Sequence, residues 1–510
     1  MSVRVSETET KYEVPDGTGM PPLDELPFGQ LTGVSAVSEP DEKLLDAEYY
    51  DTDDLRLIRS GITLRRRTGG SDDGWHLKLP DGADTRQEIR LPPGQRGVPP
   101  AELAGLVRAY VRGAELRPVA RMATRRQTVV LLDGAGEPLA EVASDDVHAE
   151  ALGDSAAVSR WHEVEVELTG GDRPLLRSAG ELLRRQGLVP ADRAAKLERA
   201  LGDRLPRPAE PPRLTPQSPA GEVVLAYLRK QAKAIMTLDP AVRSDQPDSV
   251  HQMRVAARRA RSALRSFGSV LDPADTEHLS GELRWLGVVL GDARDAEVLA
   301  GHLKQSLRAV PVEQLIGPVQ ARVQRHFASV RTRARAAVLA GLDSQRYLSL
   351  LDAIDQLLAD PPLRSRAADP AAEVLPGEVG RACRQVGRRI RRARHAPAGQ
   401  PLDVALHQAR KSAKRARYAA EAVSSAFGTP AAGFASRMKK LQSVLGEHQD
   451  AVITRQVIRE LGVKANLAGE NAFTFGLLFE RENSRAERAA AKARKVWRRA
   501  SRPRYGRWLS

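Results

Sequence analysis

Two stretches of the chain are near copies of each other. His251–Arg265 reads HQMRVAARRARSALR, and His407–Glu421 reads HQARKSAKRARYAAE, at an offset of 156 residues. A second matching pair follows, Leu290–Ala296 and Leu445–Ala451, at an offset of 155 residues. Two motifs repeated in the same order at nearly the same spacing indicate an internal duplication. We therefore expect two similar halves that pack about a pseudo-twofold axis.

Both copies have the periodicity of a helix with cations along one face. At about 100° per residue, the first stripe holds His251, Arg254, Arg258, Arg261 and Arg265, and the second holds His407, Arg410, Lys414 and Arg417. The apolar side chains of the first copy, such as Met253 and Leu264, fall on the opposite face. A solvated surface is the ordinary explanation for such a stripe. However, it contains no carboxylate, so its charges repel one another, which favours a shared anionic partner.

The charge of the chain is divided unevenly. Residues 1–210 hold 28 Lys/Arg and 37 Asp/Glu, a balance of −9, whereas residues 211–510 hold 51 and 28, a balance of +23. This asymmetry indicates two modules, of which the second has a polyanionic partner. Between them, residues 205–219 contain six prolines and predict a stiff, extended linker.

Composition excludes several classes of protein. The chain has 510 residues, too many for one core, and with 41% hydrophobic residues it can bury real cores. It contains no apolar run of about 20 residues for a membrane span and no signal-peptide pattern. The single cysteine, Cys383, excludes an intramolecular disulfide framework and a multi-cysteine metal site. We therefore expect a cytoplasmic protein that could associate with polyphosphate granules.

The first module predicts strands in which ionised and apolar side chains alternate. Every second residue of a strand lies on one face, so Glu7, Glu9 and Lys11 share a face. Further strands are expected at 62–67, 75–79, 86–90, 121–132, 139–147 and 162–168. A closed barrel of about eight strands can enclose a small ligand. With its ionised faces inward, its lumen would suit a polyphosphate held by Arg and Lys and by divalent metal on the carboxylates.

An ordered set of motifs resembles the CYTH, or triphosphate tunnel metalloenzyme, superfamily over about residues 3–203. The motifs are Glu7–Lys11 (ETETK), Tyr49–Thr52 (YYDT), Leu64–Arg67 (LRRR), Trp75–Lys78 (WHLK), Glu163–Glu167 (EVEVE) and Ala195–Leu197 (AKL). The resemblance implies an eight-stranded antiparallel tunnel that hydrolyses triphosphate-containing substrates with Mg²⁺ or Mn²⁺.

The same resemblance implies roles for individual residues. Glu7, Glu9 and Lys11 would be catalytic. Metal would be held by Glu7, Glu9, Asp145, Glu163 and Glu165. The triphosphate would be bound by Lys11, Arg65, Arg67, Lys78, Arg90, Arg121, Arg125 and Lys196. Strand parity leaves open whether Arg125 or Arg126 points inward, and likewise Asp145 or Asp146.

The duplicated segments resemble the CHAD domain, an all-α domain often found behind a CYTH domain. This resemblance implies two four-helix halves whose basic helices line a pore or groove that binds inorganic polyphosphate, with Arg488 and Lys492 contributing beside the two stripes. We expect a CYTH domain at 1–205, a linker at 206–219, a CHAD domain at 220–500 with halves of about 220–360 and 377–500, and a tail at 501–510. The overall class is multidomain α+β.

Two functional classes remain open from the sequence. One is a metal-dependent triphosphatase tethered to polyphosphate; the other is a non-catalytic adaptor for polyphosphate or nucleic acid. A nucleotide cyclase would use the same tunnel. Proteins that bind single-stranded nucleic acid usually interleave aromatic residues for base stacking, whereas aromatics make up only 4% of this chain. Nucleic acid is therefore the less favoured partner, and no membrane partner is expected.

Overall fold

The protein is described by a computed structural model that covers residues 3–15, 22–81, 85–153, 157–192, 195–205, 212–502 and 505–509; the side chains of residues 292–294 and 296 are not described. The chain divides into two compact units, Met1–Glu210 and Pro211–Ser510. Of the expected linker, residues 206–211 lie outside the described part. Every described helix is too short or too polar to cross a membrane.

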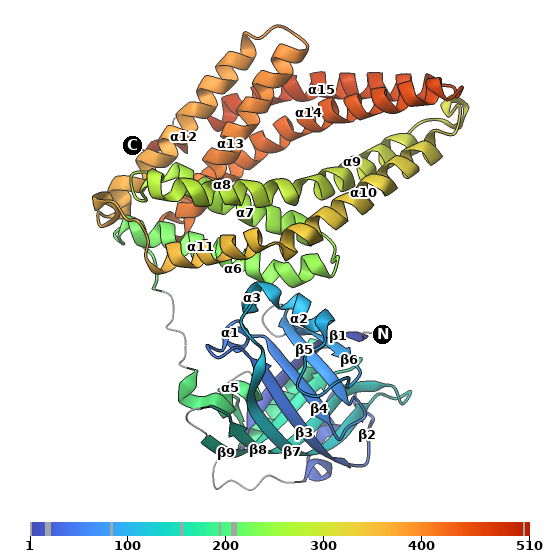
Figure 1. Ribbon diagram of the computed structural model, residues 1–510, viewed down its shortest axis with the longest axis vertical. Coiled ribbons are helices and arrows are strands. Elements are labelled where there is room, and N and C mark those ends of the chain that lie inside the picture. The colour runs from blue at the N-terminus through green and yellow to red at the C-terminus, as the bar shows by residue number, and fades with distance from the viewer. Residues whose placement is uncertain are drawn as a thin grey trace. The chain divides into compact units, whose positions relative to one another are not determined.

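Unit 1 is a closed antiparallel β-barrel (Figure 1). The order around the barrel is β1-β6-β5-β4-β3-β7-β8-β9, and pairing of β1 with β9 closes it. The eight strands are β1 (Val3–Glu13), β3 (Asp41–Asp51), β4 (Thr63–Thr68), β5 (Gly74–Pro80), β6 (Thr85–Leu91), β7 (Arg117–Leu132), β8 (Pro138–Ala151) and β9 (Ala157–Leu168). Two short strands, β2 (Ala36–Val37) and β10 (Val189–Pro190), pair with β7 and β1. The expected eight-stranded tunnel is confirmed.

The alternation read from the sequence decides which face of each strand is inside. The barrel cavity is lined by Glu7, Glu9 and Lys11 of β1, while Val164 and Val166 of β9 pack outward into a hydrophobic core. Helix α4 (Arg173–Arg185) covers that core with its apolar face; the Asp172 side chain accepts a hydrogen bond from Leu175 N and caps the helix. Apolar burial therefore lies outside the barrel wall, and the ionised faces turn inward.

Short helices complete unit 1. They are α1 (Arg56–Arg59), α2 (Ala101–Leu106), α3 (Arg108–Val111), α5 (Lys196–Leu201) and the 3-10 turns η1 (Leu23–Glu25), η2 (Phe28–Gln30) and η3 (Gly202–Arg204). Leu23 and Phe28 are fully buried against the outer core. Residues 22–33 thus cover one part of the barrel's outer surface.

Unit 2 is all-α in its described residues. Its helices are α6 (Ala220–Arg243), α7 (Ser249–Ser266), α8 (Pro273–Val289), α9 (Gly291–Arg308), α10 (Val319–Asp343), α11 (Gln345–Ala359), α12 (Ala371–Arg394), α13 (Gln400–Phe427), α14 (Thr429–Leu467) and α15 (Phe473–Ala500). The short 3-10 turns are η4 (Val312–Gln314), η5 (Ser365–Ala367) and η7 (Arg507–Leu509).

The two halves of unit 2 are joined reciprocally where each begins. Ala220 N donates to Asp369 O, and Ala371 N donates to Ser218 O. Pro219 and Pro370 form an antiparallel bridge. This exchange of equivalent bonds is the contact that a twofold axis produces. The duplication inferred from the sequence therefore has a pseudo-twofold in the structure.

The basic helices of the two halves, α7 and α13, contact each other. The apolar side of α7 is buried, including Met253 and Leu264, so the helix turns its cationic stripe away from its own core. The far ends of the halves share a second core, in which Leu303 and Phe327 meet Ile458 and Phe475 (Figure 1). The halves therefore hold each other in place at both ends.

Candidate functional site

The barrel of unit 1 encloses a charged cavity of about 320 Å³. Its basic lining consists of Lys11, Lys43, Arg65, Arg67, Lys78, Arg86, Arg90, Arg126 and Lys196, and its acidic lining consists of Glu7, Glu9, Asp72, Glu88, Glu141, Glu165 and Glu167. These side chains come from all eight strands, from the turn between β4 and β5, which carries Asp72, and from the start of α5. Such a cavity suits a compact polyanion, because many cations are available to bind it and the carboxylates beside them could hold a divalent metal.

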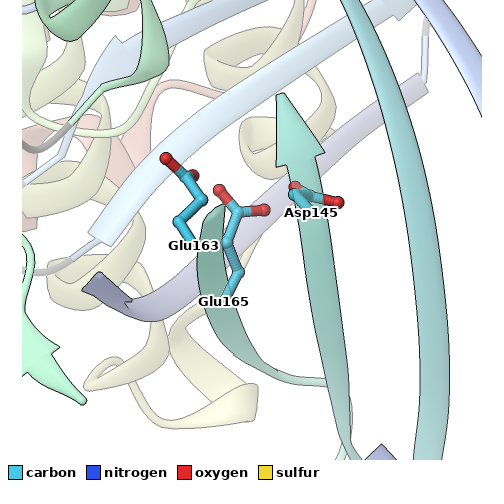
Figure 2. Close-up of side chains that lie close together, drawn as sticks. All are labelled: Asp145, Glu163 and Glu165. Atoms are coloured by element: carbon cyan, nitrogen blue, oxygen red, sulfur yellow. The ribbon is translucent and has the colours of Figure 1, made fainter. Parts of the chain in front are cut away.

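Three carboxylates converge on one side of the barrel, from Asp145 of β8 and from Glu163 and Glu165 of β9. One oxygen from each lies within 4.8 Å of the other two, and Figure 2 shows the three side chains close together. Strand pairing explains this proximity, since Asp145 is directly opposite Glu163 in the β8–β9 ladder. We call these three residues the carboxylate triad.

The ammonium of Lys196 lies among the triad. Its Nζ is 2.8 Å from Asp145 Oδ2 and 2.6 Å from Oε1 of both Glu163 and Glu165. Burial by itself lowers the pKa of Lys196, but attraction to Asp145, Glu163 and Glu165 outweighs it and holds the pKa well above its usual range. Lys196 begins α5, at the helix end where a cation is unfavourable, so it is the triad and not the helix that stabilises this charge.

Two more cations contact the triad. Arg126 donates to both oxygens of Asp145, at 2.7 and 2.6 Å, and to Glu165 Oε2 at 2.7 Å. Lys11 donates to Glu165 Oε1. Burial by itself raises the pKa of Glu165, but attraction to Lys11, Lys196 and Arg126 outweighs burial. The pKa of Glu165 therefore lies well below its usual range. All three carboxylates are therefore surrounded by fixed positive charge.

A second charged group lies around Glu7. Glu7 Oε2 is 2.5 Å from Lys78 Nζ, and Oε1 is 3.3 Å from Arg90 Nη2. Burial, then repulsion by Glu88, raises the pKa of Glu7 against the opposing effect of Lys78. Glu88 is fully buried and bonded to His76 Nδ1 at 2.9 Å. Predicted residues Glu7, Lys78 and Arg90 thus form a group apart from the triad.

The structure corrects two predicted phosphate ligands. Arg125 is on the outer face of β7, with 67% of its side chain exposed, and pairs with Glu42 at 3.2 Å. Arg121 shares that face and pairs with Glu48 at 3.2 Å. Arg126 is the inward arginine, and Asp145 is the inward aspartate, because Asp146 pairs with Arg160 outside. Because the two arginines are adjacent, either one could point inward in a strand. Only the pairing of β7 with β3 and β8 decides which of them does.

Several cavity residues were missed by sequence reasoning. Tyr49 accepts a hydrogen bond from Arg65 Nη1 at 3.2 Å, and attraction to Arg65 outweighs burial and lowers the Tyr49 pKa. Burial, followed by repulsion from Glu7, raises the pKa of Glu167 to about 7. The signal was present for Glu167, which continues the i, i+2 alternation of β9. The sequence signal was weak for β3, because apolar residues separate its inward residues Lys43 and Tyr49.

In unit 2, the first turns of the two stripes converge. The side chains of Arg254, Arg258, Arg410 and Lys414 interact electrostatically, and we call these four residues the twin-helix cluster. Burial, then repulsion from Arg410 and Arg258, lowers the pKa of Lys414 to about 7. The Nε atoms of Arg258 and Arg410 are buried without a hydrogen-bond partner. A bound anion would reduce the repulsion among these cations and would accept hydrogen bonds from the unpaired Nε atoms.

The second duplicated motif supports the first. Arg254 Nη1 is 2.7 Å from Asp295 Oδ1 and 3.4 Å from Gly291 O. In the other half Arg410 Nη2 is 4.0 Å from Asp450 Oδ1 and lies against Gly446. Glycine at both positions leaves room for the guanidinium to lie across the helix. The aspartates therefore orient arginines, and the two copies of the motif do so in the same way.

Other predicted polyphosphate ligands have different surroundings. His407 Nδ1 is 2.6 Å from Gln449 Oε1, and burial followed by nearby cations lowers its pKa, so the histidine is neutral near pH 7. Arg417 pairs with Glu421 at 2.6 Å. Arg488 is exposed, and exposed Lys492 pairs with Glu447 at 3.3 Å. The stripe residues Arg261 and Arg265 interact with a different set of arginines from the twin-helix cluster.

The carboxylate triad has the donor chemistry for a divalent cation. Mg²⁺ and Mn²⁺ prefer carboxylate oxygens, and the triad brings three such groups together. Glu9 stands nearby, 3.4 Å from Lys11 Nζ. The residues fit the metal in ligand type, and a bound cation would share the triad with Lys196.

Comparisons with known proteins agree with both units. The CYTH domain profile matches residues 6–200, and the CHAD domain profile matches residues 226–459. Two uncharacterized proteins from strains of Mycobacterium tuberculosis are each 38% identical over 497 residues, covering 94% of this chain and 94% of their own.

Solved structures that are similar to parts of the chain were also found. PptA from Streptomyces chartreusis is 24% identical, covers 55% of this chain and 100% of its own, and has a TM-score of 0.46. HpAC1 from Hippeastrum, an adenylyl cyclase candidate described as having a dominant triphosphatase activity, is 15% identical, covers 39% of this chain and 97% of its own, and has a TM-score of 0.25. On the two domain matches and the full-length relatives, this chain belongs to the family of two-domain proteins in which a CYTH domain is followed by a CHAD domain.

Proposed function

We propose that the barrel of unit 1 (residues 1–205) hydrolyses a phosphoanhydride bond of inorganic triphosphate or a related triphosphate, and that the helical domain (residues 220–500) binds inorganic polyphosphate. The observation that carries the first part is the cavity of about 320 Å³ in which cations and carboxylates face each other. Phosphoryl transfer needs little covalent help from a protein but much charge neutralisation and positioning.

The cations of the cavity have a direct task in this reaction. Lys11, Arg65 and Lys78 would neutralise the non-bridging oxygens while water attacks the terminal phosphorus and its bond to the bridging oxygen breaks. Attraction to Glu165 and Glu9 outweighs burial and raises the pKa of Lys11, so its ammonium keeps its proton. Guanidinium groups bind phosphate with paired hydrogen bonds.

The acidic residues supply the metal site of the proposal. Asp145, Glu163, Glu165 and Glu9 would hold Mg²⁺ or Mn²⁺. The metal, when bound, supplies charge neutralisation on phosphate oxygens and lowers the pKa of bound water. Glu7 would hold metal only by leaving Lys78 and Arg90, which makes it the weakest of the predicted ligands.

A matched pair of variants tests the tunnel. Asp145→Asn changes the buried triad, whereas Asp146→Asn changes the neighbouring aspartate on the outer face. We expect the first to lower metal-dependent phosphate release from tripolyphosphate by at least about 100-fold, and the second to leave it within about twofold. The thermal unfolding transition of unit 1 reports whether each variant is folded. Equal activity of the two variants would contradict the site.

One observation favours a second function for unit 1. Lys196, Arg126 and Lys11 already neutralise the triad without metal, as expected of a non-catalytic adaptor. If the wild-type chain releases no phosphate from tripolyphosphate or nucleoside triphosphates with Mg²⁺ or Mn²⁺, the adaptor function replaces the triphosphatase. Cyclic nucleotide as the product from ATP would instead indicate a cyclase.

Polyphosphate binding rests on the twin-helix cluster, in which the Nε atoms of Arg258 and Arg410 are buried without a hydrogen-bond partner. Any polyanion would bind with a steep salt dependence, so affinity alone does not identify the partner. A competition titration at fixed ionic strength separates the two polymers. We expect long-chain polyphosphate to displace a labelled polyphosphate chain well below the concentration at which a mixed-sequence oligonucleotide does so, and equal displacement would contradict this preference.

A further inference from the structure

The pseudo-twofold of unit 2 is broken at one position of the basic stripes. The residue at the end of the first copy is Arg265, and its counterpart 156 residues later is Glu421. Glu421 accepts a hydrogen bond from Arg417 Nε at 2.6 Å in its own helix and from Arg259 Nε at 3.0 Å across the helix pair. In the second copy the end of the stripe is therefore neutralised from both sides.

The first copy has no such carboxylate, and a group of arginines gathers there instead. Four helices contribute to it, and we call it the arginine patch: Arg261 and Arg265 of α7, Arg284 of α8, Arg389 of α12 and Arg415 of α13. Burial, then repulsion from Arg265, Arg284 and Arg415, lowers the pKa of Arg261. Burial, then repulsion from Arg265 and Arg389, lowers the pKa of Arg415.

The patch is uncompensated. Within the described residues of unit 2, none of the five arginine side chains forms an ion pair or a hydrogen bond, and Arg261 Nε is buried without a partner. The twin-helix cluster differs, because Asp295 and Asp450 accompany its arginines. Like charges held together without a counter-charge raise the free energy of the protein, and a phosphate chain would lower it through paired guanidinium contacts.

The patch lies along the same stripe of α7 as the twin-helix cluster. Arg254 and Arg265 are eleven residues apart, which is about 16 Å along a helix. A short anion that fills the twin-helix cluster would leave the patch empty, whereas a long one that follows α7 would reach both. In the other direction Glu421 already pairs with Arg417 and Arg259, so these two guanidiniums are less available to an anion.

We propose that the arginine patch is a second anion subsite, which extends the twin-helix cluster in one direction only and makes the domain prefer long polyphosphate chains to short ones. This inference rests on the proposed polyphosphate binding and specifies the substrate class of that site. It assigns roles to Arg284, Arg389 and Arg415, which lie outside both stripes.

The pseudo-symmetry supplies a sharp test. Arg265→Glu gives the first copy the residue of the second, and the introduced carboxylate would face Arg261 and Arg415 as Glu421 faces Arg417 and Arg259. The control is Arg308→Glu, which makes the same change of charge at an exposed position of α9. Both full-length variants are titrated with labelled long-chain polyphosphate at one ionic strength. Tripolyphosphate binding to the helical domain is measured by its displacement of this label, because the tunnel of unit 1 would also bind tripolyphosphate.

We expect Arg265→Glu to weaken long-chain binding by about tenfold or more relative to Arg308→Glu, since phosphate contacts and their released counterions are lost. Tripolyphosphate binding should stay within about twofold of wild type for both variants. Equal weakening by the two variants would mean that net charge alone acts. Weakening of both chain lengths by the same factor would mean one undivided site. Either result overturns the inference.

Failure of the proposed function gives a different result. If the wild-type chain binds neither phosphate polymer, polyphosphate binding itself is wrong. If an oligonucleotide binds as tightly as long-chain polyphosphate and Arg265→Glu weakens both alike, the patch serves nucleic acid, which also overturns the inference.

Discussion

Nζ of Lys196 lies 2.6 Å from Oε1 of Glu165, although the two residues are 31 positions apart in the chain. Asp145 and Glu163 contact the same ammonium, so one lysine at the start of α5 holds together three carboxylates from two strands. The ion pairs are almost completely buried. A divalent cation would bind the same oxygens, and lysine and metal therefore compete for the triad.

Without Lys196, unit 1 should depend more strongly on a divalent metal ion to balance the charge of the triad. Lys196→Met leaves buried carboxylates with less counter-charge. We expect the free energy of unfolding of unit 1 to fall by about 3–5 kcal/mol without metal. Mg²⁺ or Mn²⁺ should then raise the transition temperature more in the variant than in wild type. Thermal unfolding with and without metal measures this. Equal metal shifts in the two proteins would show that the triad does not bind the cation.

Neighbouring arginines on β7 should differ sharply in function. Arg126→Met removes the guanidinium that contacts Asp145 and Glu165, and we expect kcat/KM for tripolyphosphate to fall by at least about 100-fold. Arg125→Met changes an exposed side chain on the outer face and should leave kcat/KM within about twofold. Steady-state phosphate release measures both. A similar loss in both variants would contradict the inward orientation of Arg126.

Tyr49 should position Arg65. The Tyr49 hydroxyl accepts a hydrogen bond from Arg65 Nη1, and Tyr49→Phe removes that acceptor while preserving the ring. We expect KM for tripolyphosphate to rise by about fivefold to tenfold, as for the loss of one hydrogen bond to a charged group, with little change in kcat. Full Michaelis–Menten analysis separates the two parameters. A fall in kcat at constant KM would indicate that Tyr49 acts on the reaction itself.

Polyphosphate affinity should depend on pH through Lys414. Its pKa is lowered to about 7 by burial, Arg410, Arg258 and Arg254, against the opposing effect of Asp450. A bound polyanion favours the charged form, so binding above pH 7 takes up a proton. Affinity should therefore level off about one pH unit or more below pH 7 and fall above it, by at most about tenfold per pH unit for one proton.

The control for this pH dependence is Lys414→Arg, because arginine keeps its charge throughout the range. Its affinity should stay level between pH 7 and pH 9. Titrations at constant ionic strength measure both proteins. If wild type and variant lose affinity in parallel as pH rises, a group other than Lys414 is responsible.

Much of the site follows from local patterns. Alternation alone places Glu7, Glu9 and Lys11 on one face, because a strand turns successive side chains to opposite sides. The same argument could not decide between Arg125 and Arg126, since either parity leaves one arginine inside. Strand β3 escaped detection because its inward face alternates a few polar residues with Leu45 and Ala47, a pattern close to that of an ordinary amphipathic segment.

Distant pairings account for the rest. The chain by itself indicated strands with one ionised face in the first domain and a duplicated helical second domain with basic stripes. The strand and helix faces repeat every two and about 3.6 residues, and the duplication repeats at an offset of 156 residues. Only the tertiary structure decided that Lys196 lies within the triad, that Asp295 and Asp450 orient arginines, and that Arg261, Arg284, Arg389 and Arg415 gather in one patch. These contacts join residues from separate strands and helices, and the charge that each group feels depends on burial and neighbours that no local pattern contains.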